Sequence, residues 1–286
     1  MRAAVAHPRR SAKTAARRRV WSLRFGIVLL LALVGTGLFA MVWTPYPPDA
    51  MGVGGIYQPP SLAHPFGTDR LGADILSRSM DAATTDVGIT VAVVALSLIV
   101  GSIWGSLAGF FGGWFDYLTM RVLELLNSFP SLLLAMLVIS IAGPGVLKVI
   151  FVVAVLPLPD YVRLIRIEIR SKKTWQFADA ARMVGRRPLG VLFAHLLPNS
   201  LRPVLSYASV NASWVAATIG ALGFLGLGIE PGSAEWGSMI SRGQDAVLSG
   251  KWWVSFFPGL GIFLLAAAFH LIGDGLSDAR TKGGRA

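Results

Sequence analysis

The chain carries, between two long apolar runs, the stretch Asp179-Ala180-Ala181-Arg182-Met183-Val184-Gly185 and, nine residues later, His195-Leu196-Leu197-Pro198. This order of small residues, glycine and proline predicts a helix, a tight turn, a second helix and a stop. Gly185 can adopt a positive φ and end the first helix. Pro188 suits the first turn of the second helix, and Pro198 is expected to interrupt the helical ladder.

Ala180 and Ala181 leave one face of the first helix flat, so that another protein can approach it closely. The local pattern fits either such a docking surface or an ordinary cytosolic helical hairpin between membrane spans. Both interpretations stay open until the rest of the chain is considered.

Composition indicates a membrane protein. Apolar residues make up 54% of the chain and charged residues only 14%, whereas soluble domains carry about 25% charged residues. The net charge of +11 would by itself also suit a protein that binds nucleic acid or anionic lipid. The Lys and Arg residues, however, gather in a few blocks beside apolar runs. This arrangement favours a protein whose partner is the lipid bilayer over one that binds nucleic acid. The lack of cysteine excludes disulfides and thiolate metal sites.

Apolar runs predict an all-α integral membrane protein with six transmembrane helices. A basic tail, residues 1–24, precedes the first span at 25–43, and it is expected to be disordered or to lie on anionic lipid. The first run lacks a clear cleavage site, so we expect an uncleaved span and no signal peptide. The other spans are expected at 87–115, 125–147, 149–166, 203–228 and 252–272.

The distribution of basic residues predicts the orientation. Of the 26 Lys and Arg residues, the ones outside the segments assigned to the cytosol are Arg70, Arg78, Lys148, Arg242 and Lys251. Positive charge collects on the cytosolic side of membrane proteins. Both termini, including the tail 279–286, are therefore expected in the cytosol, with an even number of spans.

An extracytoplasmic loop is predicted at 44–86, with a proline cluster at its start and the run GTDRLGADILSR at 67–78. Its two glycines allow sharp turns, and its charged residues can cross-link the loop. The candidate residues of this loop are Gly67, Thr68, Asp69, Arg70, Gly72 and Asp74. The run resembles the GTD-x-LG-x-D-x-LSR segment of peptide and nickel permeases. It predicts a lid or a docking surface for a substrate or a substrate-binding protein.

Glycines at 101, 105 and 109 lie along one face of the second predicted span. They either allow a neighbouring helix to approach closely or are merely tolerated in lipid. Gly112-Gly113 predicts a short cytosolic turn, and Arg121 and Glu124, one turn apart, are expected to pair.

Candidates for the translocation path or its gate lie where spans three to five carry prolines or polar groups: Phe129, Pro130, Asp160, Asn211 and Trp214. Asn127-Ser128-Phe129-Pro130 is expected to kink span three or free its carbonyls. Pro157 and Pro159 interrupt span four. Asp160 either pairs locally, with Arg163 or a neighbouring helix, or contacts the path. Asn211 either bonds a neighbouring helix or lines the path.

A second extracytoplasmic loop is predicted at 229–251. Within it Glu235-Trp236-Gly237-Ser238-Met239-Ile240 predicts a short interfacial helix with Trp236 as its anchor.

Signatures of catalysis are missing from the sequence. It has no G-x-x-x-x-G-K-[ST] phosphate-binding loop, no G-x-S-x-G nucleophile, and no metal-ligand spacing among its four His residues. We therefore expect no enzyme, no bound cofactor and no metal. Energy for transport would then be ion-coupled or supplied by a partner, so a proton-coupled secondary transporter remains the alternative class.

Residues 64–278 resemble the permeases of dipeptide, oligopeptide and nickel ABC importers. The stretch at 170–198 is similar to their EAA loop; FLGLG at 224–228, EWG at 235–237 and GDGLSD at 273–278 also fit. Asp179 stands where the family usually has Glu. His195 stands where the general pattern has Ile, although peptide-type permeases often carry His.

The resemblance implies a type I permease of the bacterial inner membrane whose core covers 87–278. It implies a second homologous permease, fused or separate ATPase subunits that carry ATP and Mg, and an extracytoplasmic substrate-binding protein. Dipeptides or oligopeptides are the implied substrate, with nickel, glutathione or haem as alternatives. The residues expected to couple to the ATPase are Asp179, Ala180, Ala181, Arg182, Gly185, Arg186, Arg187, His195, Leu197 and Pro198.

Overall fold

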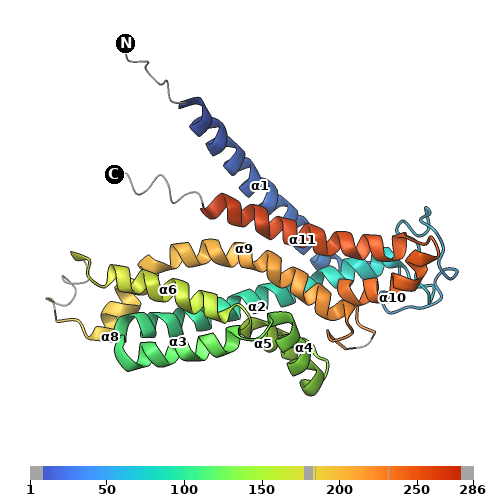
Figure 1. Cartoon of the computed structure of the whole chain (residues 1–286). Coiled ribbons are helices and arrows are strands. Elements are labelled where there is room, and N and C mark those ends of the chain that lie inside the picture. The colour runs from blue at the N-terminus through green and yellow to red at the C-terminus, as the bar shows by residue number, and fades with distance from the viewer. Residues whose placement is uncertain (1–8, 177–182, 184, 231, 278–286) are drawn as a thin grey trace, which may run out of the picture.

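The structure is a computed structural model that describes residues 9–176, 183, 185–230 and 232–277, with side chains from Val20 to Leu276 (Figure 1). Throughout those residues the chain is helical or irregular, apart from one isolated bridge between Thr68 and Asp74. The helices are α1 (Arg9–Ala40), α2 (Ile75–Phe111), α3 (Gly113–Asn127), α4 (Ser131–Ala142), α5 (Val146–Val155), α6 (Leu158–Lys172), α8 (Pro188–Val191), the π-helix η1 (Leu192–Leu196), α9 (Leu197–Phe224), α10 (Trp236–Leu248) and α11 (Trp253–Ser277).

Three helices of the described chain are long and apolar enough to cross a bilayer: Val20–Ala40 within α1, the whole of α2, and Trp253–Leu276 within α11. α3 and α4 meet the same criterion only as a pair, and they are bent by 83° at the break between them. The all-helical membrane class is thus confirmed. Helix length and composition give three or four spans, however, and do not establish the expected six.

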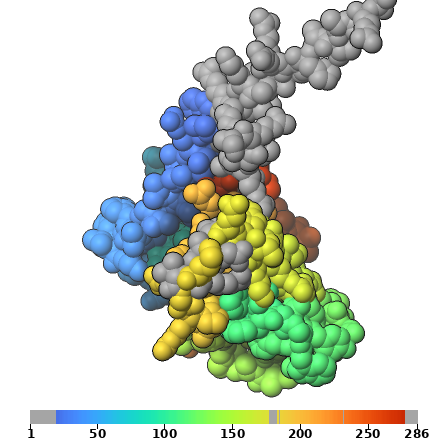
Figure 2. All heavy atoms as spheres, turned by 90° about the vertical axis from the view of Figure 1, so that its left-hand side faces the viewer, coloured from blue at the N-terminus to red at the C-terminus, as the bar shows by residue number. Residues whose placement is uncertain are grey.

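The packing places α2 and α11 at the centre of the bundle. α2 packs against α1, α5, α6 and α9, while α11 packs against α1, α9 and α10. In Figure 1 the start of α1, the end of α11 and α8 lie at one end of the molecule, and α10 and the loop after α1 lie at the other. Figure 2 looks onto the first end, where α3, α6 and the segment that leads into α9 gather in green, yellow and orange.

The glycine stripe of α2 is a site of close helix packing. A Cβ at Gly101 would stand 2.5 Å from the Tyr161 Cβ, and one at Gly109 would stand 2.7 Å from the Arg166 carbonyl oxygen. At Gly105 it would overlap Ile165 and the Val162 carbonyl group. The first interpretation, close approach of a neighbouring helix, is confirmed, and that helix is α6.

α2 begins earlier than the sequence indicated. Its first residue is Ile75, inside the range expected to be loop, because the Asp74 side chain accepts hydrogen bonds from the Ser77 N–H at 2.8 Å and the Ser77 hydroxyl at 2.7 Å. A carboxylate that caps the first turn starts a helix wherever it lies. The expected loop boundary at residue 86 is therefore wrong.

The predicted turn after α2 and the predicted breaks near Pro130 and Pro157 are confirmed. Gly112 separates α2 from α3, whose first residue is Gly113, and the two glycines have φ values of 68° and 57°. Residues 128–130 break α3 from α4, and Pro157 lies between α5 and α6. Arg121 and Glu124 form an exposed ion pair of 2.7 Å.

Candidate functional site

A cavity of about 450 Å³ opens beside two breaks in the helices, one between α3 and α4 and one between α5 and α6. It is lined by residues from the end of α3, the start of α4, the junction of α5 and α6, and the middle of α9: Leu126, Asn127, Phe129, Ser131, Leu134, Val155, Leu156, Pro157, Asp160, Tyr207, Val210, Asn211 and Trp214. Of the residues predicted for a translocation path, Phe129, Asp160, Asn211 and Trp214 therefore share one cavity. Pro130 is not in the lining, but it separates Phe129 from Ser131, which are.

Proline explains why the backbone opens here. Pro130 is the N-cap of α4, and its ring cannot continue the ladder of α3. Pro159 has no N–H, so it cannot donate the usual helical hydrogen bond to the Val155 carbonyl group. The Asp160 N–H donates to the Pro157 oxygen at 3.1 Å and not to the Leu156 oxygen, which would be its partner in a regular α-helix. Breaks of this kind are tolerated in membrane proteins where the freed backbone lines a cavity.

Asp160 takes part in both arrangements that the sequence left open. Its Oδ2 accepts a hydrogen bond from the Tyr207 hydroxyl of α9 at 3.0 Å, and its Oδ1 lies 3.9 Å from the Arg163 guanidinium. The same side chain also lines the cavity. Asn211 behaves likewise, since its Oδ1 accepts from the Tyr161 hydroxyl of α6 at 3.2 Å while the residue faces the cavity.

Most of the candidate loop residues hold the loop together and do not face solvent. Gly67 and Gly72 have positive φ and lie where a side chain would meet the carbonyl groups of Gln58 and Gly54. The Asp69 Oδ1 accepts from two backbone N–H groups of its own turn.

Further contacts cross-link the loop as far as Asp74, the N-cap of α2. The Thr68 hydroxyl donates to the Gly55 carbonyl group at 2.5 Å, and the buried Asp74 lies 2.9 Å from the His64 Nδ1. Arg70 is exposed and free to meet another protein.

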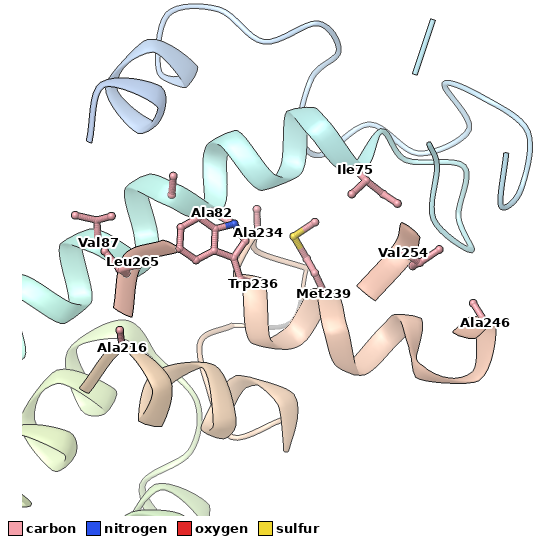
Figure 3. Close-up of a cluster of buried hydrophobic side chains, with 11 residues drawn as sticks. Ile75, Ala82, Val87, Ala216, Ala234, Trp236, Met239, Ala246, Val254 and Leu265 are labelled. Carbon is pink, nitrogen blue, oxygen red and sulfur yellow. The ribbon is translucent and has the colours of Figure 1, made fainter. Parts of the chain in front are cut away.

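Trp236 is not the interfacial anchor that the sequence predicted. Only 2% of the residue is exposed, and its indole packs between α2 and α11, where Figure 3 shows it pointing at α2 beside Ala82 and Val87. Its Nε1 donates to the Ser79 carbonyl group at 3.1 Å. The helix α10 also extends well beyond the predicted residue 240, to Leu248.

Two carboxylates whose burial the sequence did not indicate hold the backbone at the start of α10. The Asp86 Oδ2 accepts from the Trp236 N–H at 3.0 Å, and the Glu235 side chain accepts from the N–H groups of Gly237 and Ser238 at 2.8 and 2.7 Å. Burial raises the pKa of the Glu235 carboxyl, against the effect of those N–H donors. The sequence placed Asp86 at the end of a loop and Glu235 at the start of an interfacial helix, and no neighbouring residue indicates that either is buried.

Asp86→Ala is expected to destabilise the fold by about 1–3 kcal/mol, because the buried Trp236 N–H would lose its acceptor. Asp86→Asn keeps an acceptor oxygen and is expected to stay close to the wild type. Thermal unfolding of the chain in lipid nanodiscs, followed by tryptophan fluorescence, measures both. Equal melting temperatures for Asp86→Ala and the wild type would contradict the role of this hydrogen bond.

The hairpin predicted at 170–198 is described in part. Asp179, Ala180, Ala181 and Arg182 lie outside the described residues. Gly185 has a φ of 80°, which fits the expected turn, and Arg186 and Arg187 are exposed. Pro188 opens α8, as predicted.

The predicted stop at Pro198 is wrong. The chain stays helical through it, because the residue falls in the first turn of α9, where a missing N–H costs little. The π-helix η1, which holds His195, joins α8 to α9 and absorbs the change of register; Leu197 is the first residue of α9. The Asn199 side chain donates to the His195 carbonyl group at 2.7 Å.

Buried side chains join this hairpin to the cavity. Val191, Leu192 and Leu196 pack in one cluster with Ile165 and Ile169 of α6. The same cluster reaches Tyr161, whose hydroxyl donates to Asn211 on the cavity wall. A displacement of the hairpin would therefore reach the cavity through α6 and α9, because packed interiors transmit strain.

Comparisons with known proteins agree on one kind of protein. A family model described as binding-protein-dependent transport system inner membrane component matches residues 101–282. The chain is 36% identical to the di/tripeptide transport system permease protein DppC of Pseudomonas aeruginosa, over 89% of this chain and 86% of that protein. It is 35% identical to the probable D,D-dipeptide transport system permease protein DdpC of Escherichia coli, over 88% and 83%. A glutathione transport system permease protein, GsiD of Pectobacterium atrosepticum, is 34% identical over 88% and 84%.

Proposed function

We propose that this chain, which belongs to the family of binding-protein-dependent transport system inner membrane components, is the permease subunit of an ATP-driven importer of dipeptides or oligopeptides. Membership of the family makes it a multi-pass transport protein of the inner membrane and not an enzyme. In the proposed complex it forms half of the translocation path, with six spans and both termini in the cytosol.

The observation that carries this proposal is the continuous packing between the cytosolic hairpin and the cavity. The hairpin is exposed at Arg186 and Arg187, and behind it Val191 and Leu192 pack against α6. A partner that moves the hairpin would thereby displace Asp160 on α6 and Asn211 on α9, which both line the cavity. This is the coupling that a transport subunit without its own ATPase needs.

The partners of the proposed complex follow from this division of labour. A second homologous permease would close the cavity, and one fused or two separate ATPase subunits, carrying ATP and Mg, would dock on the hairpin 175–187. A substrate-binding protein would deliver the peptide to the extracytoplasmic loops. Nickel, glutathione or haem are the alternative substrates, and a proton-coupled secondary transporter is the alternative class.

Reconstitution separates these alternatives. The chain is placed in proteoliposomes with the products of its neighbouring genes, and uptake of a labelled dipeptide is followed with ATP inside the vesicles. We expect uptake that requires both ATP and the binding protein. Uptake by the chain alone, driven by a pH gradient without ATP, would replace the proposal by the secondary transporter.

Arg70→Glu tests the docking role of the loop. Deleting 64–78 would remove the cap of α2 along with the loop, so a change confined to the exposed Arg70 is the sharper experiment. We expect the binding-protein concentration for half-maximal uptake to rise about tenfold, because charges at the rim of an interface mainly set association. Arg70→Gln, which removes the charge without reversing it, should give a smaller rise. An unchanged concentration dependence in both variants would remove Arg70 from the docking surface.

A further inference from the structure

Asp160 is the charged side chain among the described residues that line the cavity. It lies in the first turn of α6, at the positive end of the helix dipole. Its side chain is 57% exposed, so a group that enters the cavity can reach it. The cavity therefore has a negative charge fixed on its wall.

The neighbouring cation is directed elsewhere. The Arg163 guanidinium is 3.9 Å from the Asp160 Oδ1, beyond hydrogen-bond distance. With the Asn127 amide turned so that its oxygen accepts, two N–H groups of Arg163 lie at 2.8 and 3.0 Å from that oxygen. Arg163 thus holds the end of α3 and is not part of the cavity lining. Arg163 is thus only a distant ion-pair partner of Asp160, which accepts its hydrogen bond from the neutral hydroxyl of Tyr207.

The rest of the lining adds acceptors and aromatic rings. The break between α5 and α6 leaves the Val155 and Leu156 carbonyl groups without their usual helical donors, since Pro159 has no N–H and the Asp160 N–H bonds Pro157. Phe129, Tyr207 and Trp214 bring three rings to the same cavity. A carboxylate, carbonyl oxygens and aromatic faces are together the chemistry that binds an ammonium group.

We propose that Asp160, with Tyr207 and Trp214, forms a subsite for a positively charged ammonium group in this cavity. The assignment of that group to the N-terminus of a transported peptide rests on the proposed function. The charge selectivity of the cavity does not rest on it, because it follows from the lining residues alone.

A thiol placed in the cavity measures this selectivity. The natural chain has no cysteine, so Ser131→Cys introduces one thiol on the cavity wall. The complex, in lipid nanodiscs, is treated with the cationic trimethylammonioethyl or the anionic sulfonatoethyl methanethiosulfonate, and labelling of this chain is followed by intact-mass spectrometry. Ser249→Cys, at an exposed position after α10, is the control for the intrinsic difference between the two reagents.

We expect the ratio of the cationic to the anionic rate to be about tenfold higher at Ser131→Cys than at Ser249→Cys, because a negative charge fixed in the same cavity raises the local concentration of the cationic reagent. Adding Asp160→Asn should return the ratio to that of the control, and adding Asp160→Glu should preserve it. A ratio that Asp160→Asn leaves unchanged would overturn the proposal, and so would a thiol that neither reagent reaches. The labelling uses no ATP and no transport, so a complex that fails to import peptides would refute the proposed function and leave this result standing.

Discussion

Gly105→Ala is expected to destabilise the folded chain by about 2–3 kcal/mol, the cost of forcing a methyl group into a well-packed interior. The new Cβ would stand 2.9 Å from the Val162 Cα and would overlap Ile165 and the Val162 carbonyl group. Backbone atoms cannot rotate out of the way as the end of a side chain can. α2 and α6 must therefore separate, and with them part of the cluster that joins the hairpin to the cavity.

Gly88 supplies the matched control on the same helix. It is exposed, and a Cβ there would meet nothing within 4 Å. Gly88→Ala should be neutral or stabilising by about 0.5–1 kcal/mol, because alanine restricts the unfolded chain more than glycine does. The two substitutions are thus predicted to have opposite signs. Thermal unfolding in nanodiscs measures both, and a Gly105→Ala protein as stable as Gly88→Ala would refute the close packing of α2 on α6.

Gly185→Pro is expected to reduce substrate uptake more than tenfold while the protein still inserts and the complex still hydrolyses ATP. Gly185 has a φ of 80°, whereas a proline ring fixes φ near about −65°. The turn before α8 would have to refold, and backbone held in an unfavourable region costs about 1–3 kcal/mol. In the proposed transporter the hairpin would then no longer meet the ATPase correctly.

The measurement compares ATP hydrolysis and uptake in the same proteoliposomes. Gly185→Asn is the control, because asparagine tolerates a positive φ better than other side chains, and it should retain coupled uptake. Asp179→Lys, in the part of the hairpin outside the described residues, is expected to uncouple the complex in the same way. Normal uptake by Gly185→Pro would show that this turn does not carry the coupling.

The sequence predicted the features that depend on neighbours along the chain. The prolines at 130, 157 and 159 indicated broken helices, because a missing N–H acts on its own helix. Gly112-Gly113 indicated a turn for the same local reason. The helical spacing of the glycines at 101, 105 and 109 indicated a packing face, although it did not identify α6 as the partner.

The sequence failed where a residue depends on a distant partner. Trp236 was expected at the membrane surface, yet its backbone N–H donates to the carboxylate of Asp86, which lies 150 residues earlier in the sequence. Asp86 was expected in a loop, yet it lies buried inside α2, where its carboxylate accepts the hydrogen bond from the Trp236 backbone N–H. Pro198 was expected to end a helix, yet the π-helix before it lets α9 begin one residue earlier. None of these outcomes has a signal in the adjacent residues.

By itself the sequence determined the class of protein, the positions of the breaks and the candidates for the cavity, because apolar runs, prolines and glycines act through local geometry. Only the tertiary structure decided that Phe129, Asp160, Asn211 and Trp214 share one cavity, and that the hairpin reaches it through Val191, Leu192 and α6. It also placed Asp86 and Trp236 together in the core. The physical reason is that burial and hydrogen bonding between helices depend on which faces meet, and the order of residues along one helix does not contain that information.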